Sequence, residues 1–143
     1  MLENIVHKNS LVAIIIRSQF ESEGIQFLTP DDFSQQLAYM KRPQNYSIQP
    51  HIHNSLKREV FYTKEVLFIK SGSARLDLYD EEKNYLESRI LKTGDVVLLA
   101  SGGHGFEILD DCEIIEVKQG PYAGEMDKER FEPVDPSLIK VIE

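Results

Sequence analysis

The sequence is poor in cysteine and in basic residues, and it has no long apolar run. The single cysteine, Cys112, excludes an intramolecular disulfide and is typical of a protein from a reducing cytoplasm, which is the location we expect. The 24 acidic residues outnumber the 16 basic ones, which gives a net charge of −8. Because such a surface repels phosphate backbones and anionic lipids, we expect neither a nucleic acid nor a membrane as partner.

The longest apolar run, Leu11–Ile16, is far shorter than the roughly 20 residues that a membrane-spanning helix needs. We also find no cationic stretch with a small-residue cleavage site that would indicate a signal peptide. The 143 residues, of which 41% are hydrophobic and 28% charged, are ordinary for one soluble globular domain with a substantial core. No linker divides the chain, so we expect a single domain over residues 1–143.

Short strand patterns dominate from Tyr46 to Lys118, where runs of alternating or apolar residues are separated by turn residues such as Gly72, Gly94 and Asp110. Many short strands at this spacing predict an all-β antiparallel sandwich or barrel with its core at about 46–118. The predicted strands are 46–53, 59–63, 66–70, 74–79, 85–91, 95–100, 105–109 and 113–118.

The N-terminal segment 11–41 predicts a strand at 11–18, a short strand at 25–28, and one short helix near Pro30–Lys41. Thr29 is expected to cap this helix, with Pro30 at its first position. The C-terminal arm, 119–143, carries more apolar residues than a solvated terminus needs. We therefore expect a homodimer in which the N-terminal strand or this arm packs on the partner, the barrel wall being the alternative place for the arm.

Three histidines and one glutamate adjoin predicted strands in a pattern that suits a metal. His51 and His53 share a face if 46–53 is a strand. Glu65 directly precedes the predicted strand 66–70. His104 follows Gly102 and Gly103, which come after the predicted strand 95–100. Glu65 also shares its parity with Leu67 and Ile69, which predicts an inward, apolar face with one carboxylate at its end. Imidazoles and a carboxylate bind Zn, Fe, Mn, Ni or Co, and the sequence does not choose between them.

The competing interpretation is that the two paired histidines and Glu65 are ordinary surface residues of strands.

These residues are also where the sequence resembles the cupins. His51-x-His53 matches the histidine pair of the first cupin motif, Glu65 with six residues before Gly72 matches its end, and Gly94 to His104 matches the second motif in outline. The resemblance covers about 46–118 and implies a jelly-roll barrel. The sequence departs from the motif at the eleven residues between His53 and Glu65, where the family has three or four.

This insertion, 54–64, leaves Glu59 as a rival carboxylate ligand, although the spacing to Gly72 favours Glu65. The insertion could form an extra hairpin over the mouth of the pocket. Ala100 and Ile108 replace the proline and asparagine of the second motif.

The resemblance implies a divalent-metal-binding cupin that acts on a small polar metabolite, and a sugar or sugar-nucleotide isomerase or epimerase is our first expectation. The segment 119–131 resembles the tail of small stand-alone cupins associated with bacterial surface-polysaccharide sugar metabolism. In this interpretation Glu107 or Lys118 moves the proton while the four ligands hold the ion. A non-catalytic sugar or metabolite sensor and an Fe(II)-dependent dioxygenase are the alternatives.

Overall fold

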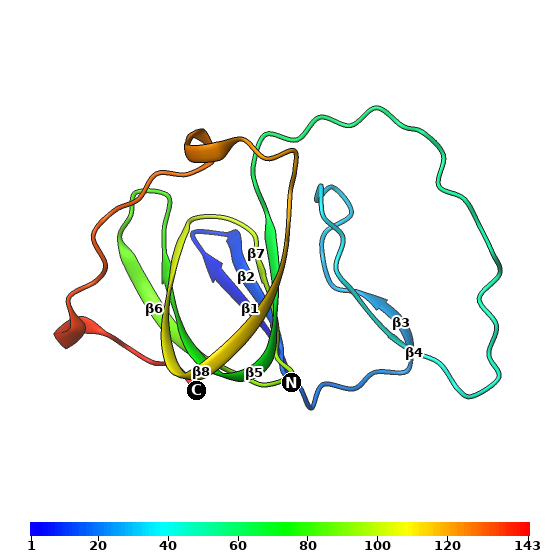
Figure 1. Cartoon of the computed structure of the whole chain (residues 1–143), viewed down its shortest axis with the longest axis horizontal. Helices are drawn as coiled ribbons and strands as arrows, with labels where there is room; N and C mark the ends of the chain where they lie inside the picture. Colours follow the sequence, from blue (N-terminus) through cyan, green and yellow to red (C-terminus); the bar gives the residue numbers. More distant parts are fainter. The chain divides into compact units, whose positions relative to one another are not determined.

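The computed structural model of the chain describes residues 1–143, which form antiparallel β-structure and two short 3-10 helices (Figure 1). The all-β prediction is confirmed. The chain divides into two compact units, one made of Met1–Phe20 with Thr63–Glu143 and one of Glu21–Tyr62. None of its helical segments is long and apolar enough to cross a lipid bilayer.

The first unit is one sheet curled into a half-barrel (Figure 1). Its strands follow the order β1-β2-β7-β5-β6, and β8 pairs with β5 in addition. Glu65 at the start of β5 pairs with both β7 and β8, so β8 lies along the other edge of β5. The strand bounds are β1 Leu2–His7, β2 Ser10–Ile16, β5 Glu65–Tyr79, β6 Tyr85–Lys92, β7 Val96–Leu99 and β8 Gly103–Lys118.

Strand β5 bends in its middle and thereby belongs to two walls. Its first part, Glu65–Phe68, pairs with β7, whereas Ser73–Tyr79 pairs with β6. The pairing with β8 shifts register at several points between Ile69 and Ala74, where Gly72 has a φ of 77°. Bulges of this kind increase twist and turn the corners of barrels.

The predicted break between 66–70 and 74–79 is therefore a bend inside one strand. The predicted break between 105–109 and 113–118 is likewise bridged by β8. In both places the turn residues of the sequence produce a bulge instead of a chain reversal, because the two long strands continue to pair across it.

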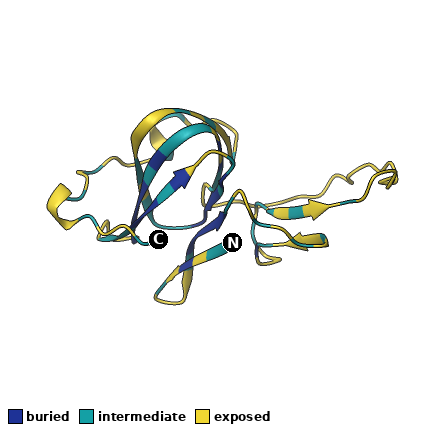
Figure 2. Cartoon of the chain, turned by 90° about the horizontal axis from the view of Figure 1, so that it is seen from below, coloured by how far each residue is buried: buried dark blue, intermediate teal, exposed yellow.

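The inner face of the half-barrel carries the hydrophobic core (Figure 2). Leu67 and Ile69 project from the first part of β5, and Leu76 and Leu78 from its second part; all are buried. They pack with apolar residues of the other strands, namely Ile5, Val12, Ala13, Ile15, Leu91, Val97 and Leu99. On β5 the core residues alternate within each part, as the side chains of an inward-facing sheet surface do, whereas β2 is buried continuously from Val12 to Ile16.

The second unit contains one hairpin, in which β3 (Gly24–Phe27) pairs with β4 (Ala38–Lys41). The predicted helix near Pro30–Lys41 is wrong. Thr29 does not cap a helix: its hydroxyl accepts a hydrogen bond from the Leu37 amide at 3.1 Å, and the Gln36 side chain donates to the carbonyls of Pro30 and Phe33. These bonds close a compact loop between the two strands, in which side chains give the backbone groups of Pro30, Phe33 and Leu37 their partners without a helix.

The predicted strands at 46–53 and 59–63 are also wrong. Residues 42–64 contain no strand, and residues 43–62 are all exposed. Alternation of side chains is a local signal, whereas a strand exists only where a neighbouring strand pairs with its backbone. Pro43 and Pro50 further remove two backbone donors from this segment.

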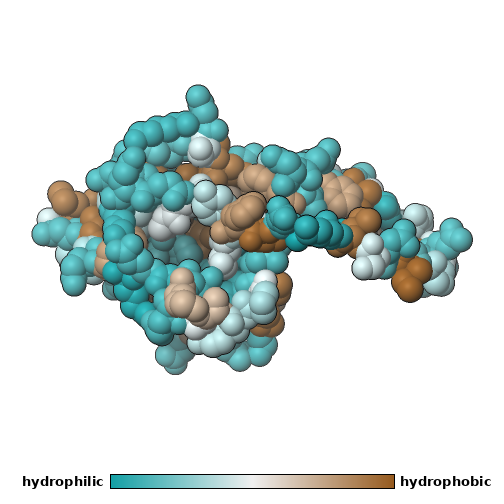
Figure 3. All heavy atoms as spheres, turned by 90° about the horizontal axis from the view of Figure 1, so that it is seen from above, coloured by the Kyte–Doolittle hydropathy of each residue, from teal (hydrophilic) through white to brown (hydrophobic).

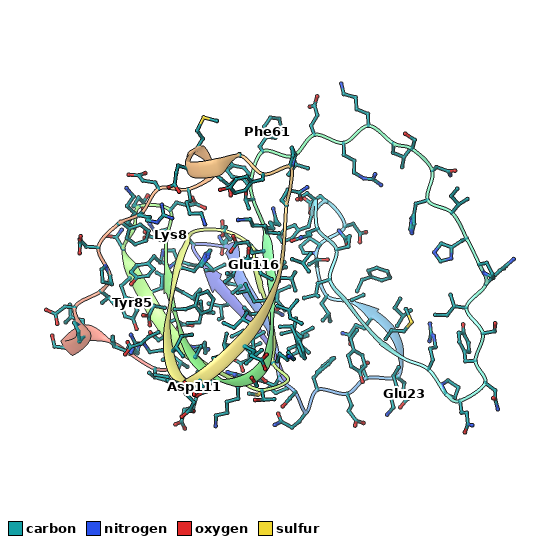
Figure 4. All side chains as sticks on the ribbon, in the orientation of Figure 1. Lys8, Glu23, Phe61, Tyr85, Asp111 and Glu116 are labelled. Carbon is teal, nitrogen blue, oxygen red and sulfur yellow. The ribbon has the colours of Figure 1, made fainter.

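The C-terminal arm packs on its own barrel wall, which was the alternative to packing on a partner. The amide of Ser88 on β6 donates to the Lys140 carbonyl at 2.9 Å, and the Ile142 amide donates to the Ser88 carbonyl at 3.0 Å. The hydroxyl of Tyr85, at the edge of β6 (Figure 4), accepts from the Lys140 amide at 2.8 Å. This pairing covers part of the free edge of β6. The arm also contains the 3-10 turns η1 (Gly124–Asp127) and η2 (Pro136–Leu138).

Candidate functional site: a carboxylate and an imidazole at the mouth of the half-barrel

Glu65 and His104 meet at one end of the inner face. The Oε2 atom of Glu65 lies 3.1 Å from Nε2 of His104, and their side chains are 13% and 32% exposed. Glu65 shares its inward parity with Leu67 and Ile69, as predicted. His104 pairs directly with Leu78, a core residue, so its side chain faces the same interior.

The bend of β5 is what brings these two residues together. In the register of the β5–β8 ribbon, Glu65 pairs with Lys118 at one end and Leu78 pairs with His104 near the other. A flat ladder would separate positions 65 and 78 by roughly 40 Å at about 3.3 Å per residue. Because the ribbon curls at Gly72, its two ends converge instead.

Two glycines before His104 allow the close approaches that place it. Gly102 has a φ of 70°, and a Cβ atom there would lie 2.2 Å from the Tyr79 carbonyl oxygen. A Cβ atom on Gly103 would lie 2.9 Å from Cζ of Phe131. A side chain at either position would therefore displace β8 or the aromatic ring, which gives a steric reason for the glycine pair.

The electrostatic surroundings keep Glu65 ionised. The hydrogen bond with His104 lowers the pKa of the Glu65 carboxyl group. Burial opposes this effect, but the positive charges of Lys118 and Lys128 lower the pKa of Glu65 further. An ionised carboxylate beside an imidazole can hold a ring orientation, accept a proton, or bind a cation.

A pocket of about 460 Å³ opens beside this pair. Its volume is within the range of small-molecule sites. In the space-filling view, hydrophilic residues surround a hollow in this unit (Figure 3). The lining combines strand ends with the C-terminal arm: Thr63, Glu65, Tyr79, Gly102, Gly103, His104, Gly105, Asp127, Lys128, Glu129, Arg130, Phe131 and Pro133.

The arm contributes a wall that the sequence did not predict. The hydroxyl of Thr63 donates to Oδ1 of Asp127 at 2.8 Å, and the ring of Phe131 contacts that of Tyr79 edge-to-face at 5.0 Å. The Tyr79 hydroxyl accepts from the Val134 amide at 3.0 Å. The excess of apolar residues in the arm indicated that it packs on a protein surface, but not that residues 127–133 line the pocket.

His51 and His53 belong to the second unit, on its exposed segment without regular structure. Their ring centroids are 5.3 Å apart, and Nδ1 of His51 lies 3.0 Å from the Gln49 carbonyl oxygen. The rival carboxylate Glu59 lies on the same segment, 3.6 Å from the Lys57 ammonium group. The expectation that the two histidines complete one ligand set with Glu65 and His104 stays a prediction.

The spacing of Glu65 and His104 is that of their hydrogen bond, and it equals the spacing of two ligands on one divalent ion. Two atoms that each lie about 2.1 Å from one ion are about 3 Å apart, which is the separation of Oε2 and Nε2 here. The structure gathers no group of three or more His, Cys, Asp or Glu side chains in such an arrangement. The pair therefore supplies at most half of the predicted ligand set.

The two predicted proton-transfer groups lie on opposite faces of β8. Glu107 pairs with Arg75 across the strands, and their side chains form an ion pair at 2.7 Å on the outer face. Lys118 is directly opposite Glu65 and shares its inward face. Of the two, only Lys118 is placed to act near the Glu65–His104 pair.

Comparison of the chain with protein-family models, with curated proteins and with solved structures finds no match. The functional interpretation therefore depends on the residues of the chain and their geometry.

Proposed function

We propose that this chain is a cupin that binds a divalent transition metal and isomerises or epimerises a sugar or sugar nucleotide. The observation that carries the proposal is the Glu65–His104 pair, which faces inward at the mouth of an antiparallel half-barrel beside a pocket of about 460 Å³. The pocket has the size for a small polar metabolite. The cupin motif spacing that predicted both residues also implies a jelly-roll fold.

The proposal assigns roles to individual side chains. Glu65 and His104 would hold the ion together with His51 and His53, and a bound divalent ion supplies polarisation of a carbonyl or hydroxyl oxygen. Lys118 is the candidate for moving the proton, because it faces the same side of the ribbon as Glu65. The geometry gives Glu107 no such place, since Arg75 holds it on the outer face.

Metal content measured on protein without a histidine tag tests the ligand set. Purified wild type is expected to retain a divalent transition metal, whereas His51→Ala and His104→Ala are each expected to lose most of it. His7→Ala is the matched control, because His7 lies outside the predicted ligand set. If His51→Ala and His104→Ala retain the wild-type metal content, the predicted metal site is wrong.

Proton exchange tests the reaction class. Incubation with sugar phosphates and sugar nucleotides in deuterated water is expected to place deuterium at a sugar carbon, since isomerases and epimerases of this kind exchange a carbon-bound proton. Tight binding of a sugar without exchange would favour the sensor. Oxygen consumption by iron-loaded protein would favour the dioxygenase.

We also propose that the protein is a cytoplasmic homodimer. The outer face of the β5–β8 ribbon supports self-association, because it exposes Phe68 opposite Ile115 and, beside them, Val117. Exposed apolar groups on a sheet face are typical of surfaces that another protein covers. Light scattering at micromolar concentration is expected to give twice the chain mass, and a monomer would contradict this proposal.

A further inference from the structure

We propose that Lys128 binds the phosphoryl group of a phosphorylated sugar substrate. This inference rests on the proposed function and deepens it, because it names the charged part of the substrate and the residue that recognises it. Lys128 lies on the pocket wall that the C-terminal arm supplies. A lysine on a protein surface is usually solvated, but Lys128 differs from the other charged residues of the pocket.

Lys128 is the one charged residue of the pocket lining that has neither a hydrogen bond nor an ion pair. The others are occupied with protein partners: Glu65 with His104 at 3.1 Å, Asp127 with Thr63 at 2.8 Å, Glu129 with Lys83 at 2.6 Å, and Arg130 with Glu125 at 2.6 Å. An ammonium group offers three donors, and here all of them remain available.

The position of Lys128 is fixed from both sides along the chain. Just before it, Asp127 is bonded to Thr63 at the entrance to β5. Shortly after it, the ring of Phe131 contacts the ring of Tyr79 edge-to-face and lies against Gly103. Anchors on either side reduce the ordering that ligand binding has to impose on this segment.

Lys128 and Glu65 line the same pocket, so one ligand in this pocket can contact both side chains. Lys118 lies directly opposite Glu65 on β8, which places a second cationic residue next to this carboxylate. A ligand with an anionic end and a hydroxylated body matches this arrangement.

Phosphate fits the anionic end, because it accepts several charge-assisted hydrogen bonds from lysine. The protein as a whole carries a net charge of −8, so it does not attract an anion from a distance, and recognition has to come from local donors. Tyr79, Phe131 and Pro133 line the same pocket and give an apolar wall for the carbon face of a sugar ring.

Calorimetric titration of the full chain tests the inference with four probes: glucose, glucose 1-phosphate, UDP-glucose and inorganic pyrophosphate. Loss of a hydrogen bond to a charged group is expected to weaken binding of the phosphorylated probes to Lys128→Met roughly ten- to hundredfold. Binding of glucose should change little. Glucose 1-phosphate and UDP-glucose separate a sugar phosphate from a sugar nucleotide as the source of the phosphoryl group.

Arg130→Met is the matched control, because it removes the same charge from the same segment at a residue already paired with Glu125. It is expected to stay within about twofold of wild type, since exposed ion pairs contribute little. Lys128→Arg should retain most of the affinity for the phosphorylated probes. Circular dichroism of each variant shows whether the fold is retained.

Equal binding of the phosphorylated probes by wild type and Lys128→Met would overturn the inference, as would a wild type that binds none of them. Equal losses in Lys128→Met and Arg130→Met would also overturn it, because the effect would then be general electrostatics. Phosphate binding that depends on Lys128, in a protein without metal or proton exchange, would support the inference while refuting the proposed function.

Discussion

Replacing Gly72 with alanine tests the bend of β5 on which the whole site depends. Gly72 has a φ of 77°, a region that costs other residues about 1–2 kcal/mol. A Cβ atom there would also lie 2.0 Å from the carbonyl oxygen of Asp111 and 2.8 Å from Cα of Cys112. Asp111 lies on β8, at the end of the half-barrel where the ribbon turns (Figure 4).

Both clashes are with backbone, so they can be relieved only if β8 moves away from β5. Forcing extra atoms into a packed site costs about 1–3 kcal/mol. Adding the conformational and steric costs, we expect Gly72→Ala to lower the free energy of unfolding by about 2–5 kcal/mol. That is a large share of the roughly 5–15 kcal/mol that stabilises a typical domain.

Urea unfolding followed by circular dichroism measures this change, and Gly105→Ala is the control. Gly105 lies on β8, the strand that pairs with β5, but a Cβ atom there would meet nothing within 4 Å. Because glycine weakens strand interiors, Gly105→Ala should be neutral or stabilise by up to about 1 kcal/mol. If the two variants have the same stability, the bend at Gly72 is not the constraint we describe.

Two further predictions concern charged residues outside the pocket. Arg17→Met should destabilise the protein by about 3 kcal/mol, because it removes the cationic partner of buried Asp95, whose Oδ2 lies 2.9 Å from the guanidinium group and which keeps only its backbone hydrogen bonds from Ser18 and Lys92. An unchanged urea midpoint would contradict this prediction. Hydrogen bonds from Asn84 lower the pKa of Asp80 in the folded protein. Ionised Asp80 therefore stabilises the β5–β6 turn at pH values above the pKa that Asp80 has in the unfolded chain. This contribution is lost as the pH falls through the lowered pKa of the folded state. The stability difference between wild type and Asp80→Asn, with the neighbouring His7 intact, should therefore shrink on acidification, and a difference that stays constant would show that Asp80 has no such role.

The strand patterns of the sequence were sufficient for the fold class but not for the extent of the strands. Alternation placed Glu65 on the same face as Leu67 and Ile69, and the structure has this arrangement. The helix near Pro30–Lys41 failed because its capping signal is also the signal of a loop closed by side chains. Which of the two forms depends on whether the flanking residues find strand partners, as Ala38–Lys41 does with β3.

The site was predictable only where its residues adjoin regular strands. Glu65 and His104 could be found because each adjoins a strong strand pattern. The pocket wall formed by residues 127–133 could not, because an irregular segment has no periodicity that shows where it returns to the barrel. Glu107 was a weak choice even from the sequence, since it is an odd number of positions from His104 on one strand and so faces the other side.

The hydrophobic pattern of β5 itself contains the reason for the bend. Its buried inward residues have odd numbers before Gly72, at Leu67 and Ile69, and even numbers after it, at Leu76 and Leu78. A regular strand would send one of these two sets outward, because its side chains alternate without exception. One extra residue in a bulge restores the inward direction, and this bulge also turns the corner between the two walls. The apolar sequence of β5 therefore requires the same irregularity that brings Glu65 and His104 within 3.1 Å, so the core and the site depend on one local feature.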